Sequence, residues 1–143
     1  MNADGIEDML LALKAKDEES TSDVNDSPTP RPLLLLTRNK DNSLELAQRN
    51  DQTILCFDCG GFFGDPYDRI VSKGNYFSVE HFGGSNWKWT RIVTYRYHPD
   101  LNKWYLHKDG GSEISPAQEI TEWVKSTKDF GQVAFEDFNI YGN

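Results

Sequence analysis

The chain has 143 residues, a length that fits one ordinary domain. Hydrophobic residues make up 37% of it, aromatic residues 13% and charged residues 27%, which excludes collagen-like, fully disordered and membrane-spanning classes. Fifteen basic against 23 acidic residues give a net charge of −8, and this balance disfavours nucleic acid as a partner.

The acidic residues are concentrated at the N-terminal end. Residues 1–30 contain eight acidic and two basic side chains, so this stretch carries −6 and leaves −2 for the other 113 residues. A charged end of this kind is either a solvated tail or a cation site, and the spacing of its oxygen-bearing side chains distinguishes the two.

The first residues have the spacing of a calcium loop. Asn2 and Asp4 carry oxygen atoms at alternate positions, Gly5 allows a sharp turn, and Asp8 supplies a later carboxylate. This pattern resembles the D-x-N-x-D-G-x-x-D loop of FG-GAP repeats. The resemblance implies that Asn2, Asp4 and Asp8 bind calcium and that Ile6 contributes its backbone carbonyl. The first aspartate of the FG-GAP loop has no counterpart in the chain, and an ordinary Asp-Gly turn is the alternative interpretation.

Two cellular addresses are compatible with the start of the chain. Met1 is followed by polar residues, without the basic start and apolar stretch of a signal peptide. Taken literally, that start indicates a cytoplasmic protein. We prefer the alternative, a periplasmic or extracellular protein with a longer natural chain, because the calcium-loop pattern is cut short at its first position.

The chain is expected to form one domain with three parts: a calcium-loop-like segment and first strand at 1–16, a flexible acidic loop at 17–32, and a main β domain at 33–143. The expected strands are residues 8–16, 33–37, 44–47, 53–56, 69–72, 76–82, 87–97, 104–107, 120–124 and 132–138. Glycines 110–111 are expected to form a turn, and residues 115–119 could open a short helix. The prediction is an all-β fold: a single antiparallel sandwich, open barrel or curled sheet of about eight to ten strands, with at most one short helix.

Cys56 and Cys59 are the only cysteines in the sequence. A zinc site would need two further ligands, usually a second such pair. A redox-active pair of this spacing normally opens a helix after a strand in a mixed fold. We favour a small structural disulfide, and leave metal binding and redox exchange open as alternatives.

An aromatic strand is the most distinctive part of the sequence. Its alternate residues share one face: Trp87, Trp89, Arg91, Val93, Tyr95 and Tyr97. Such a row can be a ligand platform for sugar rings or a peptide, with Trp87, Trp89 and Trp104 as stacking rings and Arg91 as hydrogen-bond donor. The same row can equally be the wall of a β core, which is the commoner arrangement.

Glu80 and His81 are the weak candidates for catalytic residues. Because neighbours on a strand point to opposite faces, the two side chains cannot form an acid–base pair alone. The sequence contains no G-x-S-x-G, P-loop, H-E-x-x-H or dinucleotide glycine motif. We therefore lean towards a protein without catalytic activity.

Three segments carry a resemblance that covers roughly residues 1–140. They read C-x-x-C-G-G-x-x-G-D-P-Y at 56–67, E-H-F-G-G-S-x-W-x-W-T at 80–90 and W-Y-L-H-K at 104–108. Together they resemble a group of uncharacterised bacterial proteins that look secreted or lipoprotein-like and often carry an FG-GAP-like loop. The resemblance implies an extracytoplasmic β protein and implies no activity.

These features predict a non-catalytic bacterial protein that binds a glycan or a protein at the cell envelope, with calcium as the one cofactor considered. The first alternative is an envelope hydrolase that acts on glycan or peptide. The second is an inhibitor or immunity protein that neutralises a basic enzyme with its acidic end.

Overall fold

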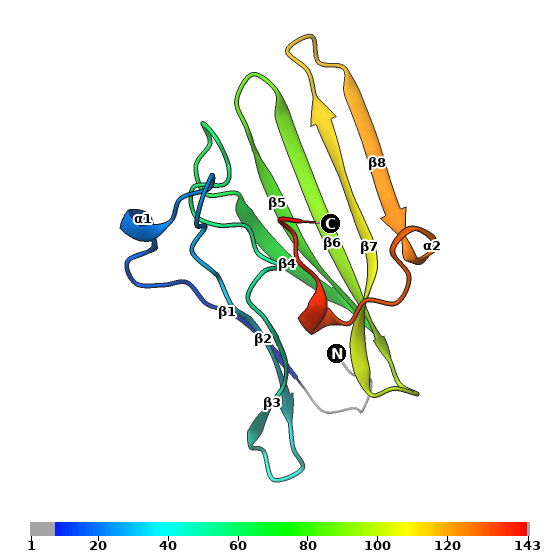
Figure 1. The fold of residues 1–143 in the computed structure, drawn as a ribbon. Helices are drawn as coiled ribbons and strands as arrows, with labels where there is room; N and C mark the ends of the chain where they lie inside the picture. Colours follow the sequence, from blue (N-terminus) through cyan, green and yellow to red (C-terminus); the bar gives the residue numbers. More distant parts are fainter. Residues whose placement is uncertain (1–7, 143) are drawn as a thin grey trace.

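The fold consists of two antiparallel β-sheets (Figure 1). The structure is a computed structural model that describes residues 8–142. The first sheet has the order β1-β2-β3, with bounds Met9–Ala12, Leu33–Arg38 and Leu44–Asn50. The second has the order β4-β5-β6-β7-β8, with bounds Tyr67–Lys73, Tyr76–Gly84, Lys88–His98, Lys103–Ile114 and Ile120–Ser126. The all-β prediction is therefore confirmed.

Helical structure among the described residues is limited to single turns. These are α1, α2 and the 3-10 turn η1, with bounds Glu18–Thr21, Thr127–Phe130 and Phe135–Asp137. No helix within residues 8–142 is long and apolar enough to cross a membrane.

The second sheet keeps its five strands in chain order because short turns connect them. Gly74 has a φ of 58° in the two-residue turn between β4 and β5, and Asn102 has a φ of 52° in the turn between β6 and β7. Glycine and asparagine adopt this left-handed backbone more readily than other residues. Each turn therefore lets the chain return directly beside the strand that it has just completed.

The core lies between the two sheets and is rich in aromatic rings. Its most deeply buried apolar members are Leu33, Leu35, Ile54, Phe77, Val79, Val93, Tyr95 and Phe135. The ring centroid of Phe77 lies 5.1 Å from that of Tyr95 and 4.9 Å from that of Trp104. Along β6, the alternate side chains of Val93, Tyr95 and Tyr97 are all buried, so this half of the aromatic row forms the core wall.

Two segments expected to be strands have other structures. Residues 53–56 are buried but lie outside the strands, and the backbone N–H of Leu55 donates to the imidazole of His81 rather than to a neighbouring strand. In residues 132–138, Ala134 makes a single bridge to Tyr105 before η1 begins. An apolar run predicts burial, and burial alone does not specify strand geometry.

The expected glycine turn and short helix also differ in the structure. Gly110 and Gly111 lie in the middle of β7, which is correspondingly longer than expected, with Gly110 opposite both Ile92 and Val124. Ser115 and Glu119 close a turn instead of a helix: the Ser115 backbone N–H donates to the Glu119 carbonyl at 2.9 Å.

The acidic loop at 17–32 is packed more firmly than its composition suggests. The Arg31 guanidinium is 4% exposed and lies 2.7 Å from carboxylate oxygens of both Glu18 and Asp65. Burial disfavours the guanidinium charge, yet the hydrogen bonds that Arg31 donates to Asp65 and Glu18 raise the pKa of Arg31 above its ordinary value. This charge cluster fastens the loop to the segment that precedes β4.

Candidate functional site

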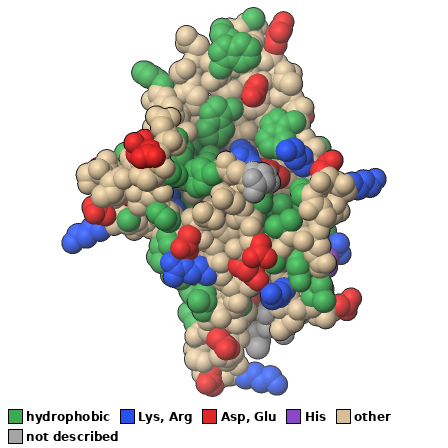
Figure 2. Space-filling model, in the orientation of Figure 1, with side chains coloured by type: hydrophobic (Ala, Val, Ile, Leu, Met, Phe, Trp, Pro, Cys, Tyr) green, Lys and Arg blue, Asp and Glu red, His purple; other side chains and the backbone are tan. Residues whose placement is uncertain are grey.

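The C-terminal segment crosses one face of the second sheet (Figure 1). Two adjoining hollows lie between this segment and the sheet. Their volumes are about 800 Å³ and about 310 Å³. Both are lined by Arg91 of β6, Trp123 of β8 and Tyr141, while Lys125 lines the larger and Trp89 the smaller. We call the two hollows and these five residues the groove. Figure 2 shows this face, with apolar and charged side chains mixed over it.

Each groove tryptophan lies against a glycine on the neighbouring strand. Trp89 is opposite Gly83, where an added Cβ would lie 2.5 Å from the Trp89 ring. Trp123 is opposite Gly111, where an added Cβ would lie 3.1 Å from the Trp123 ring nitrogen and 2.3 Å from the Thr90 carbonyl oxygen. Aromatic side chains commonly cover strand glycines in this way. The missing glycine side chains therefore make the space that the two indole rings occupy.

The centre of the groove is held by Arg91. Its Nε and Nη2 donate to the Asp109 carboxylate at 3.0 Å and 2.7 Å, and its Nη1 donates to the carbonyl of Ile140 at 2.9 Å. The guanidinium carbon also lies 5.8 Å from the centre of the Trp123 ring, and the Lys125 ammonium lies 6.0 Å from it. Both distances are within the range of cation–π attraction. These contacts hold the Arg91, Trp123 and Lys125 side chains in place.

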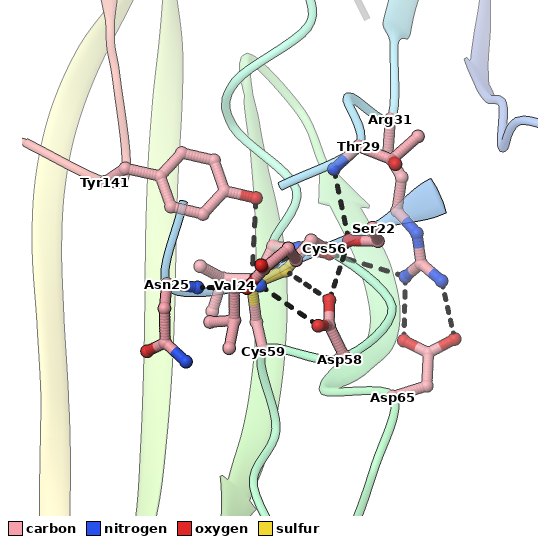
Figure 3. Close-up of a disulfide and its surroundings, with 12 residues drawn as sticks. Ser22, Val24, Asn25, Thr29, Arg31, Cys56, Asp58, Cys59, Asp65 and Tyr141 are labelled. Atoms are coloured by element: carbon pink, nitrogen blue, oxygen red, sulfur yellow. Dashed lines mark hydrogen bonds and ion pairs between the residues drawn. A yellow bond between two sulfur atoms is a disulfide. The ribbon is translucent and has the colours of Figure 1, made fainter. Parts of the chain in front are cut away.

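A disulfide joins Cys56 to Cys59 beside the groove (Figure 3). The Asp58 carboxylate within the disulfide loop accepts hydrogen bonds from the Ser22 hydroxyl at 2.6 Å and from the Val24 backbone N–H at 3.0 Å. The Ser22 hydrogen bond lowers the pKa of Asp58 below its ordinary value. The disulfide loop and the acidic loop are thereby connected.

Tyr141 connects the disulfide to the C-terminal segment. Its hydroxyl donates to Cys59 Sγ at 3.8 Å (Figure 3), and its ring is 39% exposed. Burial raises the pKa of Tyr141 above its ordinary value, so the hydroxyl keeps its proton near neutral pH. One residue earlier, the Ile140 backbone N–H donates to the Gln52 carbonyl at 2.8 Å. The C-terminal segment is therefore anchored at two points, Cys59 and Gln52.

The structure places Glu80 and His81 on opposite faces of β5. His81 is 2% exposed, its Nε2 accepts from the Leu55 backbone N–H at 3.1 Å, and its Nδ1 has no hydrogen-bond partner among the described residues. Burial lowers the pKa of His81 to about 4. Glu80 instead accepts from Arg69 Nε at 3.1 Å. The two side chains are not brought together, and His81 has the environment of a neutral core residue.

The structure separates the four residues of the predicted platform. Trp89 and Arg91 line the groove. Trp87, in the turn before β6, is 59% exposed and lines neither hollow. Trp104 is 3% exposed and packs against Phe77, so it cannot offer its ring to a ligand. Trp104 is therefore removed from the platform, because its side of β7 faces the core.

The predicted calcium ligands fall mostly beyond the part of the chain that the structure describes. Asn2, Asp4 and Ile6 lie outside residues 8–142. The Asp8 carboxylate accepts a hydrogen bond from the Arg38 backbone N–H at 3.2 Å. Among the described residues, no group of three or more histidine, cysteine, aspartate or glutamate side chains could hold a metal ion. Calcium binding by the first residues stays a prediction.

Sequence reasoning missed Trp123, Asp109 and Tyr141. Trp123 belongs to a strand that was expected, but its contact with Arg91 depends on Gly111 being inside β7. If Gly110 and Gly111 are assigned to a turn, the pairing of β7 with β6 and β8 cannot be predicted from the sequence. The buried side chains of this strand do not alternate throughout, because a β-bulge beside Thr94 and Tyr95 moves burial from Trp104 and Leu106 to Asp109, so no regular pattern within residues 103–114 could have found them.

Comparisons with known proteins leave this geometry as the basis for a functional conclusion. A scan against protein-family models, a search of the curated proteins and a search of the solved structures each found no significant match. The groove residues are therefore interpreted from their own contacts.

Proposed function

We propose that the protein is a non-catalytic binding module that holds an extended glycan in the groove. The observation that carries this proposal is the combination of Trp89 and Trp123 with Arg91 along two adjoining hollows. A sugar ring offers an apolar face of C–H groups and a rim of hydroxyls. Indole rings suit the apolar face, and fixed charged groups suit the rim.

The order of groups along the groove supports a ligand longer than one ring. The smaller hollow is lined by Trp89, and the larger by Lys125 and Asp137, while Trp123 and Arg91 are common to both. A chain of sugar rings can therefore stack at the common wall and extend into either hollow. A ligand of one sugar ring would occupy only one of the two hollows.

The cell envelope is the address that we propose. Disulfides persist mainly in oxidising compartments such as the periplasm and the cell exterior, and the structure joins Cys56 to Cys59 in one. Surface polysaccharides are the abundant extended glycans of that environment. The disulfide thus supports the same setting that the resemblance to secreted bacterial proteins implies.

A binding screen tests the proposal, with soluble fragments of bacterial envelope polysaccharides and peptidoglycan as probes. Binding is expected to change tryptophan emission, and Trp123→Ala is expected to cost about 1–3 kcal/mol of binding free energy. Trp87→Ala is the matched control, because Trp87 is exposed but lines neither hollow. Melting curves of both variants separate lost binding from lost folding.

Two results would contradict the proposal. The first is a wild-type protein that binds no glycan but captures an envelope protein, which is the other class of ligand predicted from the sequence. The second is glycan binding that Trp87→Ala abolishes and Trp123→Ala leaves unchanged, which would move the site to the turn before β6.

A further inference from the structure

We propose that the Cys56–Cys59 disulfide is an exchangeable redox site, in which a dithiol reductant attacks the sulfur of Cys59. This inference goes beyond the proposed function and does not depend on glycan binding. It rests on three features of the site in Figure 3: unequal access to the two sulfurs, hydrogen-bond donors at Cys59, and a carboxylate at Cys56.

Access distinguishes the two sulfurs. Cys56 is 0% exposed, whereas Cys59 is partly buried and lines the smaller hollow together with Trp89 and Tyr141. That hollow has a volume of about 310 Å³, which admits the thiol end of a small reductant or of a side chain. A thiol that enters the groove therefore meets Cys59 first.

Two hydrogen-bond donors point at the sulfur of Cys59. The Cys56 backbone N–H donates to Cys59 Sγ at 3.2 Å, and the Tyr141 hydroxyl donates to it at 3.8 Å (Figure 3). Hydrogen bonds to a thiolate stabilise its negative charge, and thiolates are the reactive form of cysteine. After reduction, Cys59 is thus the sulfur prepared to carry the charge.

The surroundings of Cys56 disfavour a negative charge on its sulfur. Its Sγ lies 3.3 Å from Oδ1 of Asp58, and Asp58 is held ionised by the hydrogen bonds from Ser22 and Val24. A neighbouring negative charge disfavours a thiolate at Cys56. Because Cys56 is the leaving group when Cys59 is attacked, the Asp58 charge slows reduction and holds the pair in its oxidised form.

The reaction is an ordinary thiol–disulfide exchange. A thiolate of the dithiol forms a bond to Cys59 Sγ, the bond to Cys56 Sγ breaks, and Cys56 leaves and takes up a proton. The second thiol of the reductant then attacks the reductant sulfur that is bonded to Cys59, and Cys59 is released as a thiolate. The protein gains two electrons and one proton, the other proton of the dithiol goes to the solvent, and the dithiol becomes a cyclic disulfide.

The test treats the folded protein with dithiothreitol at neutral pH, followed by a brief pulse of iodoacetamide and peptide mass spectrometry. We expect reduction to proceed while the circular dichroism spectrum stays native, with Cys59 alkylated about ten-fold faster than Cys56. With the monothiol glutathione in place of the dithiol, the mixed disulfide should form on Cys59.

Two variants separate this chemistry from simple exposure. Tyr141→Phe removes only the hydroxyl and should lower the alkylation rate of Cys59 about three-fold, without changing that of Cys56. Asp58→Asn removes the charge and should make the pair easier to reduce, measured as the equilibrium reduced fraction in a glutathione redox buffer. Melting curves show whether each variant is folded.

Three results would overturn the proposal. They are a disulfide that is reduced only when the protein unfolds, a glutathione adduct on Cys56 rather than Cys59, and an Asp58→Asn variant that is folded yet no easier to reduce.

Discussion

Arg91 on β6 and Asp109 on β7 are joined by two hydrogen bonds although they are not opposite each other in the sheet. Arg91 is opposite Gly111, and Asp109 is opposite Val93. Because Gly111 has no side chain, the guanidinium can reach diagonally to the carboxylate. The ion pair, the glycine and the Trp123 ring that covers it therefore form one arrangement, and removing any part should affect the others.

The first prediction removes the carboxylate from this pair. Asp109 is 6% exposed, so Asp109→Ala leaves Arg91 without its main partner in a partly buried place and should lower the free energy of unfolding by about 2 kcal/mol. Urea unfolding measures the change. Glu80→Ala is the control, because its partner Arg69 is 66% exposed and surface pairs contribute little. Equal losses in the two variants would contradict a structural role for the pair.

The second prediction adds one methyl group under the groove. In Gly111→Ala the new Cβ would lie 2.3 Å from the Thr90 carbonyl oxygen and 3.1 Å from the Trp123 ring nitrogen, so the strands or the ring must move. Overpacking of this kind costs about 1–3 kcal/mol of stability. Tryptophan emission should shift as Trp123 is displaced. Gly142→Ala, with no atom within 4 Å of its added Cβ, should change neither quantity.

These two predictions also show what the sequence can and cannot specify. The alternation of Val93, Tyr95 and Tyr97 predicts a strand with one buried face, because side-chain direction in a strand has a period of two. A glycine can either form a turn or lie within a strand beneath an aromatic ring, and the local sequence does not distinguish these two roles. The ring that covers Gly111 comes from Trp123, 12 residues further along the chain, so only the register of β7 with β8 settles its meaning.

The candidate site depends on contacts that are still more distant in the sequence. Tyr141 reaches Cys59 across 82 positions, and Arg91 reaches the Ile140 carbonyl across 49. Neither contact leaves a periodic pattern in the sequence, so composition and spacing could supply Trp89 and Arg91 but not the wall that completes the groove. The buried position of Trp104 likewise follows from its packing on the core side of β7 and not from its residue type.

The third prediction concerns the pH dependence of stability. Burial lowers the pKa of His81 from 6.5 to about 4 in the folded protein, so between these values the unfolded chain binds a proton that the native state does not. The contribution of His81 to the free energy of unfolding is therefore complete above pH 6.5. It is lost as the pH falls towards 4, by about 3 kcal/mol in total.

His81→Gln tests this assignment. Glutamine can still accept the hydrogen bond from Leu55 but carries no proton that titrates in this range. The free energy of unfolding of the variant should fall less steeply than that of the wild type from pH 6.5 to pH 4.5, as measured by urea unfolding at each pH. Parallel curves for the two proteins would show that other groups cause the acid sensitivity.

The last prediction concerns the charge cluster that fastens the acidic loop. Arg31 and Glu18 are each 4% exposed at their side chains, and Arg31 also holds Asp65. Arg31→Met leaves the buried Glu18 carboxylate without this partner, which costs about 3–5 kcal/mol of stability. The double variant Arg31→Met with Glu18→Gln removes that unpaired charge and should recover part of the loss.

Arg49→Met, at an exposed pair with Asp51, is the control and should leave the unfolding curve unchanged. A folded Arg31→Met variant as stable as the wild type would mean that the loop is held by its other contacts, among them the hydrogen bonds to Asp58.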